Sequence, residues 1–253
     1  MNDDQLLRYS RHLLLDGWDA DVQERLLRST VLVVGAGGLG NVVLMYLAAA
    51  GVGTLVVMDP DRIELSNLQR QVAYRGAWVG LPKVEAARRA IADLNPDVRV
   101  IALEQRADAD DLGAQVRRAD VVVDATDHWA ARQLINGVCV SEGRPLVFGA
   151  ALRDQGQLAV FDARRDDAPC YACAFPPEAV PEETRCALMG VFAPLTGMVG
   201  AAQAGEALKL LTGRGEPLTG RIALIDARRM QWSEMIVPRL PTCSVCSSRG
   251  GWV

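Results

Sequence analysis

The sequence lacks a strong excess of charge of either sign. Among its 253 residues, 27 are Lys or Arg and 31 are Asp or Glu, so the formal net charge is −4. Nucleic-acid-binding domains are typically far more basic, and a balance this close to neutral names no charged partner. Half of the residues are hydrophobic, which is typical of a folded chain long enough for one large α/β domain.

Targeting segments, membrane spans and repeats are also missing from the sequence. The N-terminus, MNDDQLLRYSRHLLL, opens with acidic residues and has neither a basic start nor a small-residue cleavage site. The apolar run at 31–34 and the helical pattern after it are interrupted by glycines, which makes them too short to span a membrane. We therefore expect a mature cytoplasmic protein.

The most informative stretch is VLVVGAGGLG at 31–40, which continues as an apolar helical pattern to residue 51. A buried parallel strand, a tight glycine turn and a helix in this order form a phosphate site, because bare amides and the helix dipole face the turn. Gly35, Gly37 and Gly38 are the candidate nucleotide-contacting residues. The turn alone does not identify the nucleotide, and a helix–strand crossing without a ligand is the alternative interpretation.

Strands and helices are expected to alternate along the first part of the chain. Strands are predicted at 30–34, 54–58, 98–103, 121–124 and 146–150, with helices at 83–95, 109–118 and 129–140 between them. This alternation favours an α/β fold with a Rossmann-like, mostly parallel sheet.

The alternation stops after residue 150. A hairpin strand at 157–161, reached through a turn at 154–156, and two short strands at 222–226 and 231–237 predict antiparallel C-terminal strands. We expect one domain with four parts: N-terminal helices at 1–29, a nucleotide-binding half at 30–163, a crossover loop at 164–190, and a final sheet with a tail at 191–253.

Charged side chains follow several of these strands. Asp59 lies 24 residues after Gly35, near where a dinucleotide fold places an acid against ribose hydroxyls, although a turn or helix cap would also use Asp. Asp127 follows the strand at 121–124 and is either a Mg²⁺ ligand or a helix cap. Lys83 stands in a first helical turn, where the dipole disfavours a cation unless an anion is near, so it either contacts phosphate or is simply exposed.

Cysteines form two pairs with metal-site spacing. Cys170-x-x-Cys173 and Cys243-x-x-Cys246 match a four-thiolate tetrahedral zinc site, and a chain without a secretion signal favours metal over disulfides. Such a closed site is structural, and it would attach the tail to the crossover loop.

Together these motifs resemble the MoeB/ThiF/HesA family, the bacterial relatives of ubiquitin-activating enzymes. The resemblance spans residues 8–246 and is carried by the GAGGLG turn, Asp59, Ser66-Asn67-Leu68-Gln69-Arg70-Gln71, Lys83, Asp124-Ala125-Thr126-Asp127 and both CxxC pairs.

The resemblance implies an adenylyltransferase that uses ATP. A ubiquitin-like sulfur carrier protein, MoaD-like or ThiS-like, would present its C-terminal Gly-Gly carboxylate to the α-phosphate. Acyl-adenylate and pyrophosphate would be the products, for molybdopterin or thiamin biosynthesis, and a separate sulfur donor protein would then be required.

The resemblance also implies roles for individual residues. Arg70 and Lys83 would contact the phosphates, Asp127 would hold Mg²⁺, and Asp59 would fix the ribose. Arg11 matches an arginine that crosses a homodimer interface to reach the partner's triphosphate. The remaining residues expected around the nucleotide are Ser66, Asn67, Leu68, Gln69 and His128.

Four positions depart from the family pattern or have an open role. His128 stands where the family usually has Asn, Asn41 where a small residue is commoner, and His12 where relatives often carry Gln. Asn41 could donate to a phosphate or act as a cap. Cys186 corresponds to the loop cysteine that some relatives link covalently to the carrier, but a spectator role is equally compatible with the sequence.

Two other functions are compatible with parts of the sequence. An NAD-dependent oxidoreductase is suggested by the glycine turn and Asp59 alone, but the only histidines are His12 and His128, and the cations at 70 and 83 would have no duty. The second is a catalytically silent, zinc-stabilised docking module for a ubiquitin-like protein. Such a module would not need the charged residues Arg11, Asp59, Arg70, Lys83 and Asp127.

Overall fold

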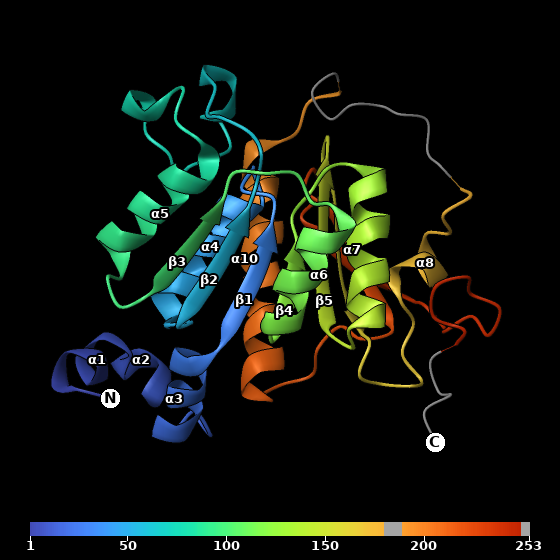
Figure 1. Cartoon of the computed structure of the whole chain (residues 1–253), viewed down its shortest axis with the longest axis horizontal. Coiled ribbons are helices and arrows are strands. Elements are labelled where there is room, and N and C mark those ends of the chain that lie inside the picture. The colour runs from blue at the N-terminus through green and yellow to red at the C-terminus, as the bar shows by residue number, and fades with distance from the viewer. Residues whose placement is uncertain (180–188, 249–253) are drawn as a thin grey trace.

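The computed structural model describes residues 1–179 and 189–248 of the chain (Figure 1). Its helices and short 3₁₀ turns alternate with strands over most of this length. The elements are α1 (Asp3–Arg8), α2 (Ser10–Leu13), α3 (Ala20–Arg28), β1 (Thr30–Val34), α4 (Gly40–Ala50), β2 (Thr54–Met58), η1 (Leu65–Asn67), η2 (Gly76–Trp78), α5 (Lys83–Leu94), β3 (Arg99–Leu103), α6 (Ala109–Arg118), β4 (Val121–Asp124), α7 (Trp129–Ser141), β5 (Pro145–Leu152), β6 (Gln155–Asp162), α8 (Tyr171–Ala174), α10 (Ala193–Thr212), β7 (Arg221–Asp226) and β8 (Gln231–Ile236).

The strands form one eight-stranded sheet in the order β3-β2-β1-β4-β5-β6-β7-β8. The first five strands in this order run parallel to one another, and β6, β7 and β8 continue the sheet in antiparallel pairs. The predicted fold class is confirmed: a mostly parallel sheet carries antiparallel C-terminal strands. The division of the domain into four functional parts stays a prediction.

Helices cover both faces of the sheet and bury its strands (Figure 1). On β1, Val31 and Val33 belong to the apolar cluster that includes α4, α5 and α10, whereas Leu32 and Val34 belong to the cluster under α6 and α7. Because successive side chains of a strand point to opposite faces, a central strand between two helical layers must be apolar throughout. This explains why the strand reads as an uninterrupted hydrophobic run.

The N-terminal helices lie at the edge of the sheet where the parallel strands begin (Figure 1). Arg8 donates to the carbonyl of Leu94 at 2.9 Å, and Gln5 donates to Asp97 at 3.1 Å. Both acceptors lie between the end of α5 and the start of β3, so α1 docks on the body at the amino ends of the strands. The prediction of helices within 1–29 is confirmed.

The hairpin between β5 and β6 is longer than expected. The two strands pair from Pro145↔Asp162 to Leu152↔Gln155, so the turn is Arg153-Asp154 and residues 155 and 156 lie in a strand. Arg153 takes the left-handed conformation, with φ 52°. The expected turn at 154–156 was wrong because the sequence carries no Asn-Gly or Asp-Gly pair to mark a two-residue turn.

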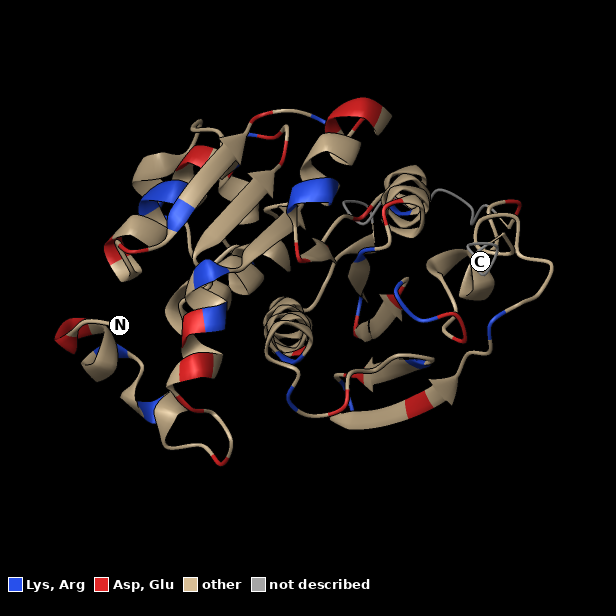
Figure 2. Ribbon diagram, turned by 60° about the horizontal axis from the view of Figure 1, so that its bottom comes forward, with Lys and Arg blue, Asp and Glu red and all other residues tan. Residues whose placement is uncertain are grey.

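Charged residues of both signs are interspersed along the chain (Figure 2). This distribution agrees with the small net charge and with the absence of a strongly basic sequence. Among the described residues, no helix is long and apolar enough to cross a membrane.

Candidate active site and metal centre

The glycine turn after β1 contacts the end of β2 through Asp59. This buried carboxylate accepts hydrogen bonds from the backbone N–H groups of Ala36 at 2.7 Å and Asp61 at 2.8 Å. Burial raises the pKa of Asp59, although the charge of Lys83 and the two N–H donors oppose that shift. Gly35 has φ +94°, and a Cβ built there would lie 2.7 Å from the carbonyl oxygen of Ala125. Glycine is therefore required where the turn meets the segment after β4.

The irregular segment between β2 and α5 brings Arg70 beside the same turn. A Cβ built on Gly38 would lie 3.4 Å from Cδ of Arg70, and one built on Gly37 would lie 3.8 Å from Nε2 of Gln71. Arg70 is half-buried and donates to the carbonyl of Ser66 at 3.2 Å. The structure thus gathers the glycines and this arginine at the carboxyl edge of the sheet.

The neighbouring residues of this segment are engaged in local contacts. Asn67 is buried, and its side-chain oxygen accepts from the backbone N–H of Glu64 at 3.2 Å. Ser66 donates its hydroxyl to the Glu64 carboxylate at 3.2 Å. Leu68 packs against the main core, and Gln69 is exposed. The side-chain oxygen of Asn67 therefore stabilises the local conformation of η1.

Lys83 is not the simple exposed lysine that the sequence left open. Its side chain is 8% exposed and its Nζ lies 2.7 Å from Oδ2 of Asp61. The backbone N–H of Lys83 donates to the carbonyl of Asp61 at 2.9 Å, so the start of α5 is attached to the end of β2 at two points. The Asp61 carboxylate that pairs with Lys83 is 59% exposed, and the backbone N–H of Asp61 donates to Asp59.

The two acids after β4 have opposite environments. Asp124 is fully buried, accepts from the backbone and hydroxyl of Thr126 at 2.9 and 2.7 Å, and has a raised pKa because of burial. Asp127 is 63% exposed and lies 3.5 Å from Nε2 of His128, which is 72% exposed. His128 is the N-cap residue of α7, and its side chain makes no capping hydrogen bond. The exposed Asp127 carboxylate beside it could hold a cation.

Arg11 lies apart from these residues. It is an exposed residue of α2, at the edge where the parallel strands begin, whereas the segments carrying Asp59, Arg70 and Asp127 follow the strands at the opposite edge (Figure 1). Within one chain, α2 and the glycine turn therefore lie at opposite ends of the parallel strands.

Three residues around the turn were not anticipated in their observed roles. Asn41 is 1% exposed; its amide donates to the carbonyls of Gly37 and Gly38 at 2.7 and 2.8 Å, and its oxygen accepts from the N–H of Ala73. Both amide hydrogens are used by the turn, so Asn41 does not face a phosphate. Tyr74 donates its hydroxyl to the carbonyl of Ala36 at 2.8 Å.

Arg132, the third residue, lies one turn into α7. It donates to the carbonyl of Thr126 at 2.8 Å, lies 5.2 Å from the ring centroid of Phe148, and its charge acts on buried Asp124. Arg132 is half-buried, and an arginine in an amphipathic helix gives no sequence signal for these contacts. Only its position soon after a strand-end acid could have suggested them.

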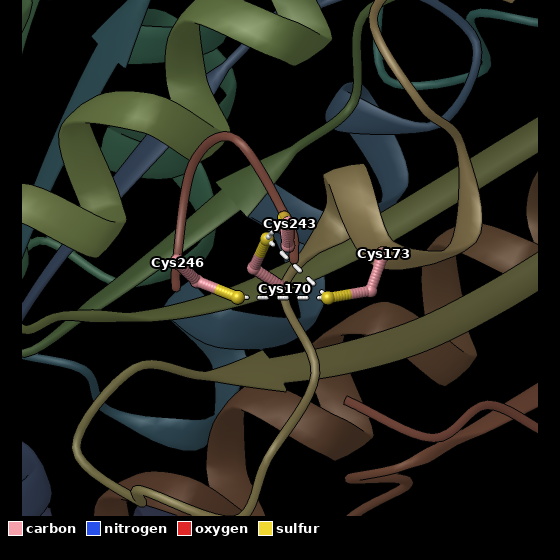
Figure 3. A group of neighbouring side chains, drawn as sticks. All are labelled: Cys170, Cys173, Cys243 and Cys246. Carbon is pink, nitrogen blue, oxygen red and sulfur yellow. Dashed lines mark hydrogen bonds between the residues drawn. The ribbon is translucent and has the colours of Figure 1, made fainter. Parts of the chain in front are cut away.

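The four cysteines of the two CxxC pairs meet in space (Figure 3). All four are buried, and their sulfur atoms lie within 4.8 Å of one another. The closest sulfur pairs measure 3.5 Å for Cys173–Cys246, 3.7 Å for Cys170–Cys243 and 4.0 Å for Cys170–Cys173.

These sulfur separations fit a tetrahedral metal ion. A zinc–sulfur bond of about 2.3 Å in a regular tetrahedron separates the sulfurs by about 3.8 Å. Burial raises the pKa of Cys170, with further contributions from Cys173 and Cys246, so thiolates at this spacing need a cation between them. The cluster could hold a metal ion. Cys186 lies outside the described residues.

Residues 9–245 of the chain match the ThiF family. A molybdopterin-synthase adenylyltransferase of Escherichia coli K12 is 44% identical over 249 residues, covering 97% of this chain and 98% of that protein. A SAMP-activating enzyme E1 of Haloferax volcanii is 47% identical, covering 97% and 90%. A sulfur carrier protein ThiS adenylyltransferase of E. coli K12 is 43% identical, covering 97% of each.

Solved structures show the same likeness. The crystal structure of E. coli MccB with ATP has a TM-score of 0.83 and 26% identity, covering 95% of this chain and 74% of that one. The glycine turn, the strand-end acids, the paired cysteines and the match over residues 9–245 lead to one conclusion: the chain belongs to the ThiF family.

Proposed function

We propose that this protein adenylates the C-terminal glycine of a ubiquitin-like sulfur carrier protein at the expense of ATP. In this reaction a carboxylate oxygen of the carrier attacks the α-phosphorus of ATP. The bond between the α-phosphorus and its bridging oxygen to the β-phosphate breaks, and pyrophosphate leaves with the electron pair. The carrier is left as an acyl-adenylate, ready for sulfur from a separate donor protein.

The observation that carries this proposal is the meeting of the glycine turn, Asp59, Arg70 and the Asp61–Lys83 pair at one edge of the sheet. Attack of an anion on a polyanion requires positive charge around the leaving phosphates. Arg70 is adjacent to the turn and donates to the backbone carbonyl of Ser66. Lys83 reaches a half-exposed carboxylate at 2.7 Å, which a phosphate could replace as its partner. The names of the relatives agree with this chemistry.

Two metal ions belong to the proposal. Asp127 would hold Mg²⁺, which neutralises phosphate charge when bound. The four clustered cysteines would hold Zn²⁺ as a closed structural site, attaching the tail to α8 and its N-cap residue Cys170.

A homodimer would complete each site. Because Arg11 lies at the far edge of the sheet from its own glycine turn, we assign it to the partner's triphosphate. The exposed Leu7, Leu14 and Leu15 beside it support an interface on these N-terminal helices, since such apolar side chains gain from burial against a second copy.

The carrier would dock on the antiparallel end of the sheet. Strand β8 is an edge strand, and its Trp232, Met235 and Ile236 are 49%, 49% and 81% exposed. An edge strand offers unpaired backbone groups to a partner strand, and exposed apolar side chains on it are an ordinary mark of an interface.

The decisive experiment is ATP–pyrophosphate exchange with each sulfur carrier protein of the same organism, with and without Mg²⁺. We expect exchange that requires one carrier, its C-terminal Gly-Gly and Mg²⁺. ATP binding without exchange for any carrier would favour a silent docking module instead. Binding of pyridine nucleotide without ATP would favour an oxidoreductase.

A further inference from the structure

Asn136 is a buried side chain of α7 that contacts the cysteine cluster. It is 1% exposed, and its Nδ2 lies 3.7 Å from the sulfur of Cys170, a residue 34 positions away in the chain. Its Oδ1 accepts the backbone N–H of Tyr171 at 2.8 Å. One side-chain amide thus contacts two consecutive residues, Cys170 and Tyr171, of the first CxxC motif.

The orientation of this amide follows from its partners. A backbone N–H can only donate, so the atom facing Tyr171 must be the amide oxygen. The NH₂ group is then turned to Cys170, where a thiolate sulfur can only accept. The contact is therefore an N–H···S hydrogen bond and not an accidental approach.

Such a donor has a physical task at this site. Four thiolates around one zinc dication carry a net charge of −2, and this charge is buried. Hydrogen bonds onto the sulfur atoms spread that charge and orient the ligands. The backbone N–H of Leu240 donates to Cys173 at 3.5 Å, and the Asn136 side chain donates to Cys170.

We propose that Asn136 is a positioning residue of the zinc site, which holds the Cys170 thiolate in its ligating geometry by donating a hydrogen bond to it. This inference rests on the zinc assignment above but not on adenylation. It makes α7, which begins soon after Asp127, a support for the metal centre near the middle of the helix.

The test is zinc retention by the full-length protein under competition with a chromophoric zinc chelator. Asn136→Asp is nearly isosteric and keeps the oxygen that accepts from Tyr171, but it turns an anionic oxygen toward the thiolate. We expect this variant to hold zinc about 10–100-fold more weakly than the wild type. If Asn136 served only to anchor Tyr171, the Asp variant would hold zinc as tightly as the wild type, and the proposal would be overturned.

Gln133→Glu is the matched control. Gln133 lies one turn earlier on α7 and donates to the carbonyl of Phe175 at 2.7 Å, not to sulfur. The same amide-to-acid change there adds the same charge to the same helix. We expect its zinc affinity to stay near that of the wild type, and an equal loss in both variants would contradict a specific N–H···S contact.

A second variant and a second readout cover the case of an Asn136→Asp protein that does not fold. Asn136→Leu is similar in size and removes the donor without adding charge, and cobalt substituted for zinc reports on the thiolates through their charge-transfer absorption. Loss of a hydrogen bond to sulfur should move that absorption to lower energy, whereas an unchanged spectrum would overturn the proposal. A wild-type protein that neither contains nor takes up zinc would overturn the metal assignment as well, whereas zinc-bound variants indistinguishable from wild type would overturn the Asn136 role alone.

Discussion

At Asp124 the fold buries a carboxyl group with unequal oxygens. Oδ1 accepts two hydrogen bonds from Thr126, while the buried Oδ2 has no hydrogen-bond partner among the described residues. Burial raises the pKa of Asp124 despite the charge of Arg132. The folded chain therefore binds this proton more tightly than the unfolded chain, and stability that is fully present below the ordinary pKa of 3.8 is lost as pH rises through the raised value.

Asp124→Asn should remove this loss. The amide oxygen can accept both bonds from Thr126, and no charge has to be buried. We expect the variant to be more stable than the wild type at pH 7 by about 1–3 kcal/mol, with the difference shrinking toward pH 4. Thermal unfolding across this pH range measures it. Asp127→Asn, at an exposed acid, is the control, and a difference independent of pH would contradict the argument.

Lys83 is the other residue whose environment makes a sharp prediction. Lys83→Ala should lower carrier-dependent pyrophosphate exchange by about 10²–10³-fold, in the range expected when a group that stabilises developing charge is removed. The fold should persist, since Asp61 is 59% exposed and remains solvated. Arg88→Ala, on the solvent side of the same helix, should exchange at the wild-type rate. Wild-type exchange in Lys83→Ala would remove this residue from the phosphate site.

At the scale of elements, the sheet separates two kinds of surface. The parallel strands end at the glycine turn and its acids, while the antiparallel strands end in β8, whose residues are all exposed. An edge strand with apolar side chains is a liability in isolation, which supports a partner there. The nucleotide and the carrier would then bind different elements of one continuous sheet.

A substitution on β8 should therefore separate the two substrates. Ile236→Asp places a charge in the proposed docking surface, and we expect the KM for the carrier to rise at least about 10-fold, comparable to losing one well-buried apolar contact. The KM for ATP should not change, because β8 lies away from the glycine turn in the sheet order. Steady-state kinetics with each substrate varied measures both, and Ile236→Val should behave as the wild type. An equal rise in both constants would count against a carrier surface.

At the scale of the whole molecule, the proposed homodimer would make each site a shared one, because Arg11 of one chain would complete the site of the other. An Arg11→Ala chain keeps its own Lys83, and a Lys83→Ala chain keeps an Arg11 to donate. Mixing and re-annealing the two inactive homodimers should restore about one quarter of wild-type exchange, because half of the random dimers are mixed and each has one intact site. Exchange that stays at the level of the separate variants would show that Arg11 acts within its own chain or not at all.

Much of the fold could be predicted from local pattern. The uninterrupted apolar run before Gly35 indicated a strand buried on both faces, and Pro82 before Lys83 marked the start of α5. Failures occurred where local signals were weak. The Arg153-Asp154 turn carries no glycine to mark it, and both strands of the hairpin continue up to this turn, further than their composition suggested.

The sequence by itself determined the alternation of strands and helices, the glycine turn and the two CxxC pairs, because each depends on residue types repeated or spaced within a short stretch. Only the tertiary structure decided that Lys83 pairs with Asp61 and that the charge of Arg132 acts on buried Asp124. It also decided that Asn136 donates to Cys170, and that α2, which carries Arg11, lies at the opposite end of the parallel strands from the glycine turn. The physical reason is that these relations join segments far apart in the chain. They are set by the order and packing of strands and helices, for which no local periodicity carries information.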